Sequence, residues 1–149
     1  MKPRIIISAC LMGENCKYNG KNNIIDISQL KECFELIPVC PECFGGLPIP
    51  REPAEMKNGR VYQKNGNDVT DEFIYGAEQT LYIAEEKNCV AALLKENSPS
   101  CGYGNIYDGS FSGKLISGNG ITAELLNSKG IAVFGESRIN KLIELYSMC

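Results

Sequence analysis

The stretch Arg4-Ile-Ile-Ile-Ser-Ala-Cys10 is a short hydrophobic run with a cysteine at its end. The same arrangement recurs in the stretch Leu36-Ile-Pro-Val-Cys40. Continuous hydrophobicity without polar alternation is typical of strands that are covered on both faces of a parallel sheet. The two stretches therefore predict buried parallel strands, each followed by a cysteine.

A third hydrophobic run, residues 89–95, is followed after a short loop by Cys101. Parallel strands have their carboxyl ends at one edge of the sheet, and open α/β sheets bind ligands at that edge. We therefore expect Cys10, Cys40 and Cys101 to lie together. Three thiolates at one corner are suited to a metal ion or an iron–sulfur cluster.

Strand and helix patterns alternate along the chain, which indicates an α/β fold. The expected strands are 4–9, 36–40, 89–95 and 131–135, and the expected helices are 28–35, 71–87, 120–127 and 137–147. Ser28 and Thr70 are placed to cap the first two helices. We expect one domain, residues 1–149, built as a three-layer α/β sandwich with a mainly parallel, Rossmann-like sheet of about four to five strands.

Two segments do not follow this alternation. Residues 57–68 contain two Asn-Gly turn signals and predict a small hairpin. Residues 98–120 are rich in glycine and have little periodicity, so we expect a long functional loop there. Within it, Ser117-Gly-Asn-Gly120 precedes a predicted helix, and two interpretations stay open: an anion site at free amides, or a turn with a cap.

The bulk composition limits the class of protein. Of the 149 residues, 44% are hydrophobic and 22% are charged, as in soluble globular proteins. The net charge of -3 and the absence of a basic cluster give no reason to expect a nucleic-acid polymer or an anionic membrane as partner. The N-terminal Ile5–Ile7 run is too short for a signal peptide or a membrane span. We expect a cytoplasmic protein; the sequence does not indicate its oligomeric state.

The chain has eight cysteines and no histidine. The missing histidine excludes Ser-His-Asp and Cys-His catalysis and every histidine-ligated metal site. In a reducing compartment, clustered cysteines more often bind metal or perform chemistry than form disulfides. For Cys33, Cys89 and Cys149 we expect a structural role instead, because free cysteine packs as a small hydrophobic residue.

Cys40 and Cys43 form a Cys-x-x-Cys motif, which allows two other hypotheses. A dithiol redox protein would carry a helix after the first cysteine, but Phe44-Gly-Gly and the prolines that follow predict no helix. A structural or sensor site could hold zinc through Cys10, Cys16, Cys40 and Cys43, although the spacing of the first two is loose for zinc. The same hypothesis of a structural or sensor protein includes an iron–sulfur cluster that has no open coordination position.

Polar residues accompany the cysteines. Glu42 follows Cys40 by two residues, and Ser98 lies just before Cys101. A carboxylate beside a Lewis acid can act as a general base on water, and a hydroxyl can donate a hydrogen bond. Glu42 is equally consistent with a solvated loop acid. Arg51, Glu52 and Glu55 either form ion pairs or orient the site.

Taken together, these motifs resemble the thiouracil desulfidase family over nearly the whole chain. The residues that carry the resemblance are Ser8-Ala-Cys10-Leu, Cys16-x-Tyr18-x-Gly20, Pro38-Val-Cys40-Pro-Glu42, Gly45-Gly46-Leu47, Pro50-Arg51-x-Pro53-x-Glu55, Asp68-Val-Thr70, Leu94-Lys95, Ser98-Pro-Ser-Cys101-Gly102 and Ile106-Tyr-Asp-Gly109. Cys43 departs from the family pattern, and Cys16 belongs to it without an expected ligand role.

The resemblance implies an oxygen-sensitive [4Fe-4S] cluster, which aerobic handling would degrade, held by Cys10, Cys40 and Cys101. One iron would stay open for the sulfur of a thiolated pyrimidine base, nucleoside or nucleotide. Glu42 would activate water and Ser98 would assist by hydrogen bonding or proton transfer. The implied reaction is a hydrolysis that releases sulfide without net electron transfer.

Overall fold

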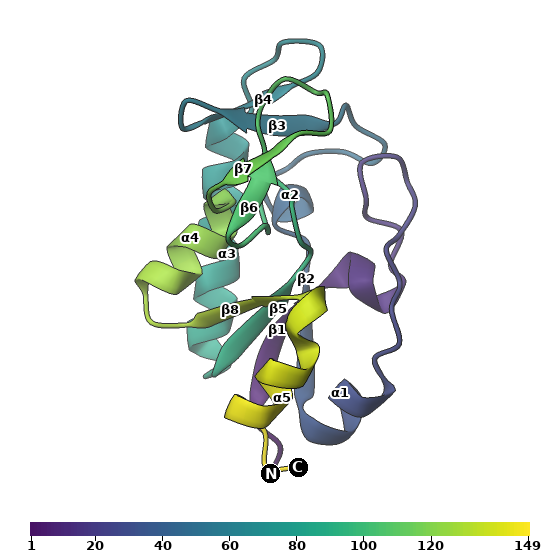
Figure 1. Ribbon diagram of the computed structural model, residues 1–149, viewed down its shortest axis with the longest axis vertical. Coiled ribbons are helices and arrows are strands. Elements are labelled where there is room, and N and C mark those ends of the chain that lie inside the picture. Colours follow the sequence, from purple (N-terminus) through teal and green to yellow (C-terminus); the bar gives the residue numbers. More distant parts are fainter.

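A parallel sheet of four strands forms the centre of the protein, and helices lie on both of its faces (Figure 1). The computed structural model describes residues 1–149. The order of the strands across the sheet is β2-β1-β5-β8. Their bounds are Arg4–Ser8 for β1, Glu35–Val39 for β2, Ala91–Leu94 for β5 and Ala132–Gly135 for β8. The predicted α/β sandwich with a parallel sheet is confirmed.

Strand β1 shows why the sheet is buried on both sides. Ile5 and Ile7 belong to one hydrophobic cluster, and Ile6 between them belongs to the other. All three side chains are fully buried. Because successive side chains on a strand point to opposite faces, this short run contributes to both layers of core. Ile5 pairs with Leu36 of β2 on one side and with Ala91 of β5 on the other.

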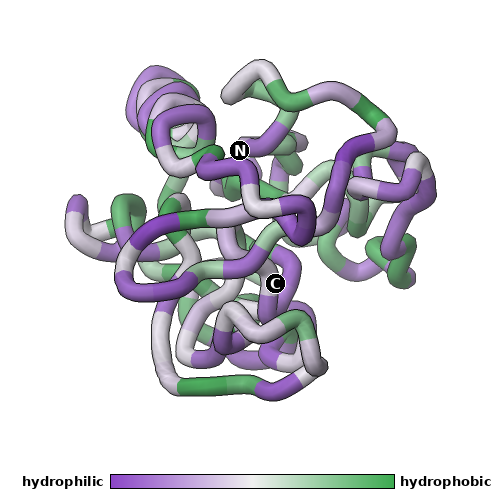
Figure 2. The backbone as a smooth tube through the Cα atoms, turned by 90° about the horizontal axis from the view of Figure 1, so that it is seen from above, coloured by the Kyte–Doolittle hydropathy of each residue, from purple (hydrophilic) through white to green (hydrophobic).

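The helices divide between the two faces of the sheet. Helices α1 (Ser28–Cys33) and α5 (Ile139–Tyr146) cover one face, and α3 (Thr70–Glu86) and α4 (Ile121–Ser128) cover the other. Figure 2 looks nearly along α3, whose outer turns are mostly hydrophilic. Two 3-10 helices, η1 (Ala9–Met12) and η2 (Glu136–Arg138), follow β1 and β8 directly.

The starts of α1 and α3 differ from the expected caps. Ser28 and Thr70 are the first helical residues, not the caps, and neither helix has a capping side chain at the residue before. Instead, Asp26 accepts a hydrogen bond from the Ser28 amide at 3.0 Å, and Asp68 accepts one from the Thr70 amide at 2.9 Å. A carboxylate reaches an amide two residues on, which satisfies a donor that the helix leaves free.

Two hairpins lie beyond the carboxyl edge of the sheet (Figure 1). The first joins β3 (Ala54–Lys57) and β4 (Arg60–Gln63) through Asn58 and Gly59, which both have positive φ. This confirms the predicted hairpin, although it begins three residues earlier. The second joins β6 (Asn105–Tyr107) and β7 (Leu115–Ser117). The expected loop at 98–120 therefore contains a hairpin that its low periodicity did not predict.

The Cys-x-x-Cys motif does lead into a helix, contrary to our expectation. Helix α2 spans Pro41–Phe44, a single turn with proline at its first position. Proline suits that position because its missing amide would have no partner in the helix. Gly45 then ends the turn and packs against α3: a Cβ at Gly45 would come within 2.0 Å of the Glu72 carbonyl oxygen.

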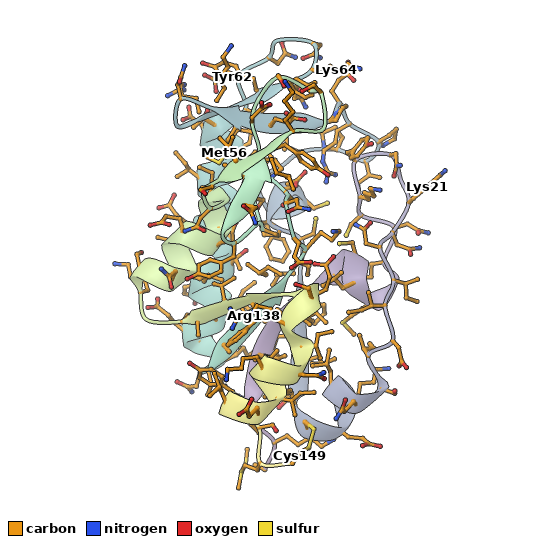
Figure 3. The ribbon with its side chains drawn as sticks, in the orientation of Figure 1. Lys21, Met56, Tyr62, Lys64, Arg138 and Cys149 are labelled. Carbon is orange, nitrogen blue, oxygen red and sulfur yellow. A yellow bond between two sulfur atoms is a disulfide. The ribbon has the colours of Figure 1, made fainter.

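Cys33 and Cys149 form a disulfide, so the expectation of free thiols is wrong for this pair. The cause is spatial: α1 ends near the chain terminus, at the end of the molecule away from the hairpins (Figure 1), and the two Cα atoms lie 5.6 Å apart. Figure 3 shows Cys149 at that end and Lys64 at the opposite one. Cys89 is a free thiol just before β5. No helix combines the length and apolarity needed to cross a membrane.

Candidate active site

A cavity of about 560 Å³ lies between the carboxyl edge of the sheet and the two hairpins. Its floor consists of the segments that follow β1, β2 and β5. Its lining includes the predicted site residues Cys10, Cys40, Glu42, Ser98 and Cys101. The structure thus brings together all five residues that the sequence singled out.

The three predicted cysteine ligands come from three different strand ends. Cys10 lies in the 3-10 turn after β1, Cys40 directly after β2, and Cys101 in the loop after β5. Burial raises the pKa of the Cys101 thiol to about 12, and the charges of Cys10 and Cys40 act in the same direction. This electrostatic coupling between the three thiols follows from their shared position at one edge of the sheet.

Cys16 also lines the cavity and is 8% exposed. A hydrogen bond from the Cys16 thiol lowers the pKa of the Cys40 thiol to about 6, although burial acts in the opposite direction. Cys40 is therefore the cysteine most easily converted to a thiolate, the form that binds metals. Cys43 does not line the cavity, and burial raises its pKa to about 11.

No three cysteine or carboxylate side chains converge as ligands of a single metal ion would. This holds for the four cysteines proposed for zinc, Cys10, Cys16, Cys40 and Cys43, and equally for Cys10, Cys40 and Cys101, so the side chains as they stand do not form a tetrahedral single-ion site. Cys40 and Cys43 are both free thiols in this structure.

Glu42 forms an ion pair with Arg51, which the sequence did not pair with it. The Nη2 atom of Arg51 lies 2.8 Å from Oε2 of Glu42, and Nε donates to the same oxygen at 2.9 Å. The Arg51 side chain is only 4% exposed and also donates to the carbonyl oxygens of Cys16 and Pro48. Glu42 is thus held in a fixed position and is not a freely solvated loop acid.

Ser98 is positioned by Cys101. Its Oγ accepts a hydrogen bond from the Cys101 amide at 2.7 Å. Because this bond occupies a lone pair of the oxygen, the hydroxyl proton of Ser98 can still be donated to another group. Residues 98 and 101 are therefore linked within one loop, and both line the cavity.

Two further lining residues belong to ion-pair or hydrogen-bond networks. Lys95 lies 2.7 Å from Glu136 at the start of η2, and its amide donates to Ser8 Oγ. Glu55 forms no ion pair; its Oε1 accepts hydrogen bonds from the amides of Gly109 and Phe111, each at 3.0 Å. The sequence motif contained Glu55, but only the fold shows which loop it holds.

The possible anion site at Ser117–Gly120 is not free. The amides of Ile121 and Thr122 donate to the carbonyl oxygens of Pro99 and Ser100. The start of α4 is therefore connected to the loop that carries Cys101. Ser117 ends strand β7 and Gly120 is the N-cap residue of α4, so the cap of the second interpretation is present and its turn is not.

Both the sequence and the structure of the chain are similar to those of known proteins. The sequence model of a family described as 2-thiouracil desulfurase matches residues 5–138. The protein YbbK of Bacillus subtilis, described as uncharacterized, is 42% identical to the chain over 150 residues, which cover 93% of this chain and 99% of that protein. A solved structure, described as the [4Fe-4S]-dependent thiouracil desulfidase TudS, is also 42% identical and has a TM-score of 0.91, with 96% of this chain and 97% of that chain covered.

Proposed function

The chain belongs to the 2-thiouracil desulfurase family, and we propose that it removes the sulfur of a thiolated pyrimidine as sulfide with the help of a [4Fe-4S] cluster. The observation that carries this proposal is one cavity that combines three strand-end cysteines with a fixed carboxylate and a hydroxyl. The resemblance found in the sequence motifs and the structural likeness to TudS both support the same activity.

The donor set fits an iron–sulfur cluster. Cysteine thiolates are the usual ligands of such clusters, and Cys10, Cys40 and Cys101 supply three of them from separate strand ends. Three protein ligands leave one iron without a protein ligand. Catalytic zinc sites likewise have three protein ligands and keep one coordination position open. When bound, the cluster supplies a thiophilic Lewis acid that distinguishes a thiocarbonyl from the carbonyl of an ordinary pyrimidine.

Glu42 is the general base of the proposed reaction. Both contacts of Arg51 are with Oε2 of Glu42, which leaves Oε1 free of side-chain partners. Oε1 can therefore accept a proton from a water molecule in the cavity, since a general base needs a hydrogen bond to the proton that it removes. Arg51 holds the carboxylate in place while this proton moves.

Ser98 is the proposed hydrogen-bond donor. Its hydroxyl oxygen is held by the Cys101 amide, so its proton can be donated to a heteroatom of the pyrimidine or to the departing sulfur. The oxygen of water replaces the sulfur on carbon, and the two protons of water leave with the sulfur as hydrogen sulfide. No electron is gained or lost, so the residues need no redox partner.

The size of the cavity is consistent with a small-molecule substrate. Its volume of about 560 Å³ lies within the range of roughly 300–1,000 Å³ that is usual for small-molecule sites. We also place the protein in the cytoplasm, because an oxygen-sensitive cluster needs a reducing compartment.

A product assay tests the proposed function. The protein would be purified without oxygen, and its cluster reconstituted, before incubation with 2-thiouracil in water enriched in oxygen-18. We expect sulfide and uracil in equal amounts, with the heavy oxygen in the uracil and no added reductant. Loss of thiouracil that depends on an electron donor, or uracil without the heavy oxygen, would contradict a hydrolysis.

A further inference from the structure

One wall of the cavity is formed by the loop that connects the two strands of the second hairpin. Phe111 lies in this loop, is partly buried and lines the cavity. Its backbone φ is 57°, in the left-handed region that bulky residues rarely adopt. Such a conformation costs free energy and persists only where the surrounding structure imposes it, often at ligand sites.

Glu55 imposes this conformation from the neighbouring hairpin. Its Oε1 accepts hydrogen bonds from the amides of Gly109 and Phe111, and the residue is 9% exposed. A buried carboxylate normally requires a cation or several donors, and here two backbone amides supply the donors. Strand β3 therefore fixes the backbone that carries the Phe111 ring.

The rest of the loop supports the same placement. A Cβ at Gly109 would lie 2.7 Å from the Met56 carbonyl oxygen, so the loop packs tightly on β3. In the same loop, Asp108 accepts hydrogen bonds from the amide and hydroxyl of Ser110. The backbone that carries the ring is therefore held before any ligand arrives, which lowers the entropy that binding must overcome.

We propose that Phe111 is a substrate-binding residue that stacks on the planar pyrimidine ring, and that Glu55 is the positioning residue that holds Phe111 in the cavity wall. This inference rests on the proposed function and names the part of the site that recognises the ring rather than the sulfur. A flat heteroaromatic ring presents a π face, and aromatic side chains bind such faces whatever the substituents on the edge.

Two other aromatic residues line the cavity, but they are less suited to this role. Tyr18 is 38% exposed, and the Lys17 ammonium lies 5.7 Å from the centre of its ring. Tyr107 belongs to strand β6, where its backbone pairs with Leu115. Among the three, only Phe111 has a positive φ and a backbone amide that donates to the buried carboxylate of Glu55.

The test compares ring binding with the chemical step in the cluster-loaded enzyme. Loss of base–aromatic stacking costs roughly 5- to 150-fold in affinity by alanine substitution. We therefore expect Phe111→Leu to raise both the KM for 2-thiouracil and the inhibition constant of uracil by about tenfold. Uracil has no sulfur, so its inhibition constant reports on ring binding alone. The kcat should change by less than about threefold, and Phe111→Tyr should restore both constants.

Matched variants separate stacking from folding. Tyr103→Leu removes an aromatic ring that is 39% exposed and does not line the cavity, and it should leave both constants unchanged. Glu55→Ala should raise the same two constants as Phe111→Leu, whereas Glu55→Gln, which keeps an oxygen acceptor, should have the smaller effect. Phe111→Met serves as the second variant if the leucine protein does not fold.

The outcomes distinguish this inference from the proposed function. If the Phe111 variants release sulfide with unchanged KM and unchanged uracil inhibition, the stacking role is wrong and the desulfidase activity stands. If the wild-type enzyme releases no sulfide from thiouracil, the proposed function is wrong. The affinity for uracil measured by calorimetry on the wild-type and Phe111→Leu proteins then decides the ring-binding role by itself: equal affinities, or no binding by either, would overturn it.

Discussion

Arg51 and Glu42 form an ion pair of 2.8 Å at the edge of the cavity, and the arginine side chain is almost completely buried. Two guanidinium nitrogens contact the same carboxylate oxygen, while a third donates to Pro48. The geometry leaves the other carboxylate oxygen available to water. The position of the proposed base therefore depends on a residue nine positions further along the chain.

We expect Arg51→Lys to lower kcat by about tenfold, because an ammonium group cannot reproduce two contacts with Glu42 and two with backbone carbonyls at once. The iron content should stay at the wild-type level. Arg51→Gln should lower kcat further and also lower the melting temperature, since it leaves a partly buried carboxylate unpaired. Steady-state kinetics and thermal unfolding measured on the same preparations check both statements. An Arg51→Gln enzyme with wild-type kcat would show that the pair has no part in the reaction.

Replacement of the proposed base should affect the rate and not the cofactor. Glu42→Gln keeps the shape of the side chain but cannot take a proton from water, so kcat should fall by about 10²- to 10⁴-fold. Iron per chain and the visible absorption should match the wild-type protein. A Glu42→Gln protein without iron would instead make Glu42 a support of the cluster.

Ser98 gives a prediction with a conservative control. Ser98→Ala removes the hydroxyl and should lower kcat by roughly tenfold to hundredfold with iron retained. Ser98→Thr keeps a hydroxyl on the same backbone and should recover most of the rate. An alanine variant as fast as the wild type would show that the Ser98 hydroxyl has no part in the reaction.

The four cysteines of the cavity should divide into two groups. Cys10→Ser, Cys40→Ser and Cys101→Ser should each lose the cluster, because each removes a proposed ligand. Cys16→Ser should retain it, because Cys16 lowers the pKa of Cys40 through a hydrogen bond and is not among the proposed ligands. Cys89→Ser, remote from the cavity lining, is the control. Loss of iron in the Cys16 variant would indicate a closed cluster with four cysteine ligands.

Asp68 should make the stability of the protein depend on pH in the acid range. Hydrogen bonds from Arg60 and Thr70 lower the pKa of Asp68 from 3.8 to about 2. Because the folded state binds this proton more weakly than the unfolded state, the contribution of Asp68 is complete above pH 4 and is lost as the pH falls towards 2. Urea unfolding of Asp68→Asn and wild type should therefore differ more at pH 5 than at pH 3. A difference that stays constant with pH would assign the effect to helix geometry alone.

The sequence contained most of the site because the site follows from strand ends. Hydrophobic runs predicted where β1, β2 and β5 lie, and parallel pairing then placed Cys10, Cys40 and Cys101 at one edge. The same reasoning placed Glu42 and Ser98, which lie within three residues of a predicted ligand. Local sequence distance was therefore sufficient for these five residues.

The features that sequence reasoning missed depend on contacts between distant segments. Nothing in the pattern shows that Glu55 accepts hydrogen bonds from amides 54 and 56 residues away, because the amides carry no sequence signal. Cys33 and Cys149 are 116 residues apart, and each looked like an isolated thiol. The hairpin at residues 105–117 was hidden because its strands are only three residues long.

The central claim is that Cys10, Cys40 and Cys101 hold a [4Fe-4S] cluster, and its most direct test is the metal content of the wild-type protein. Iron, acid-labile sulfide and zinc would be measured per chain after anaerobic purification and reconstitution. We predict about four iron and about four sulfide per chain, the content of one such cluster. Zinc without sulfide, or neither metal after reconstitution, would contradict the account.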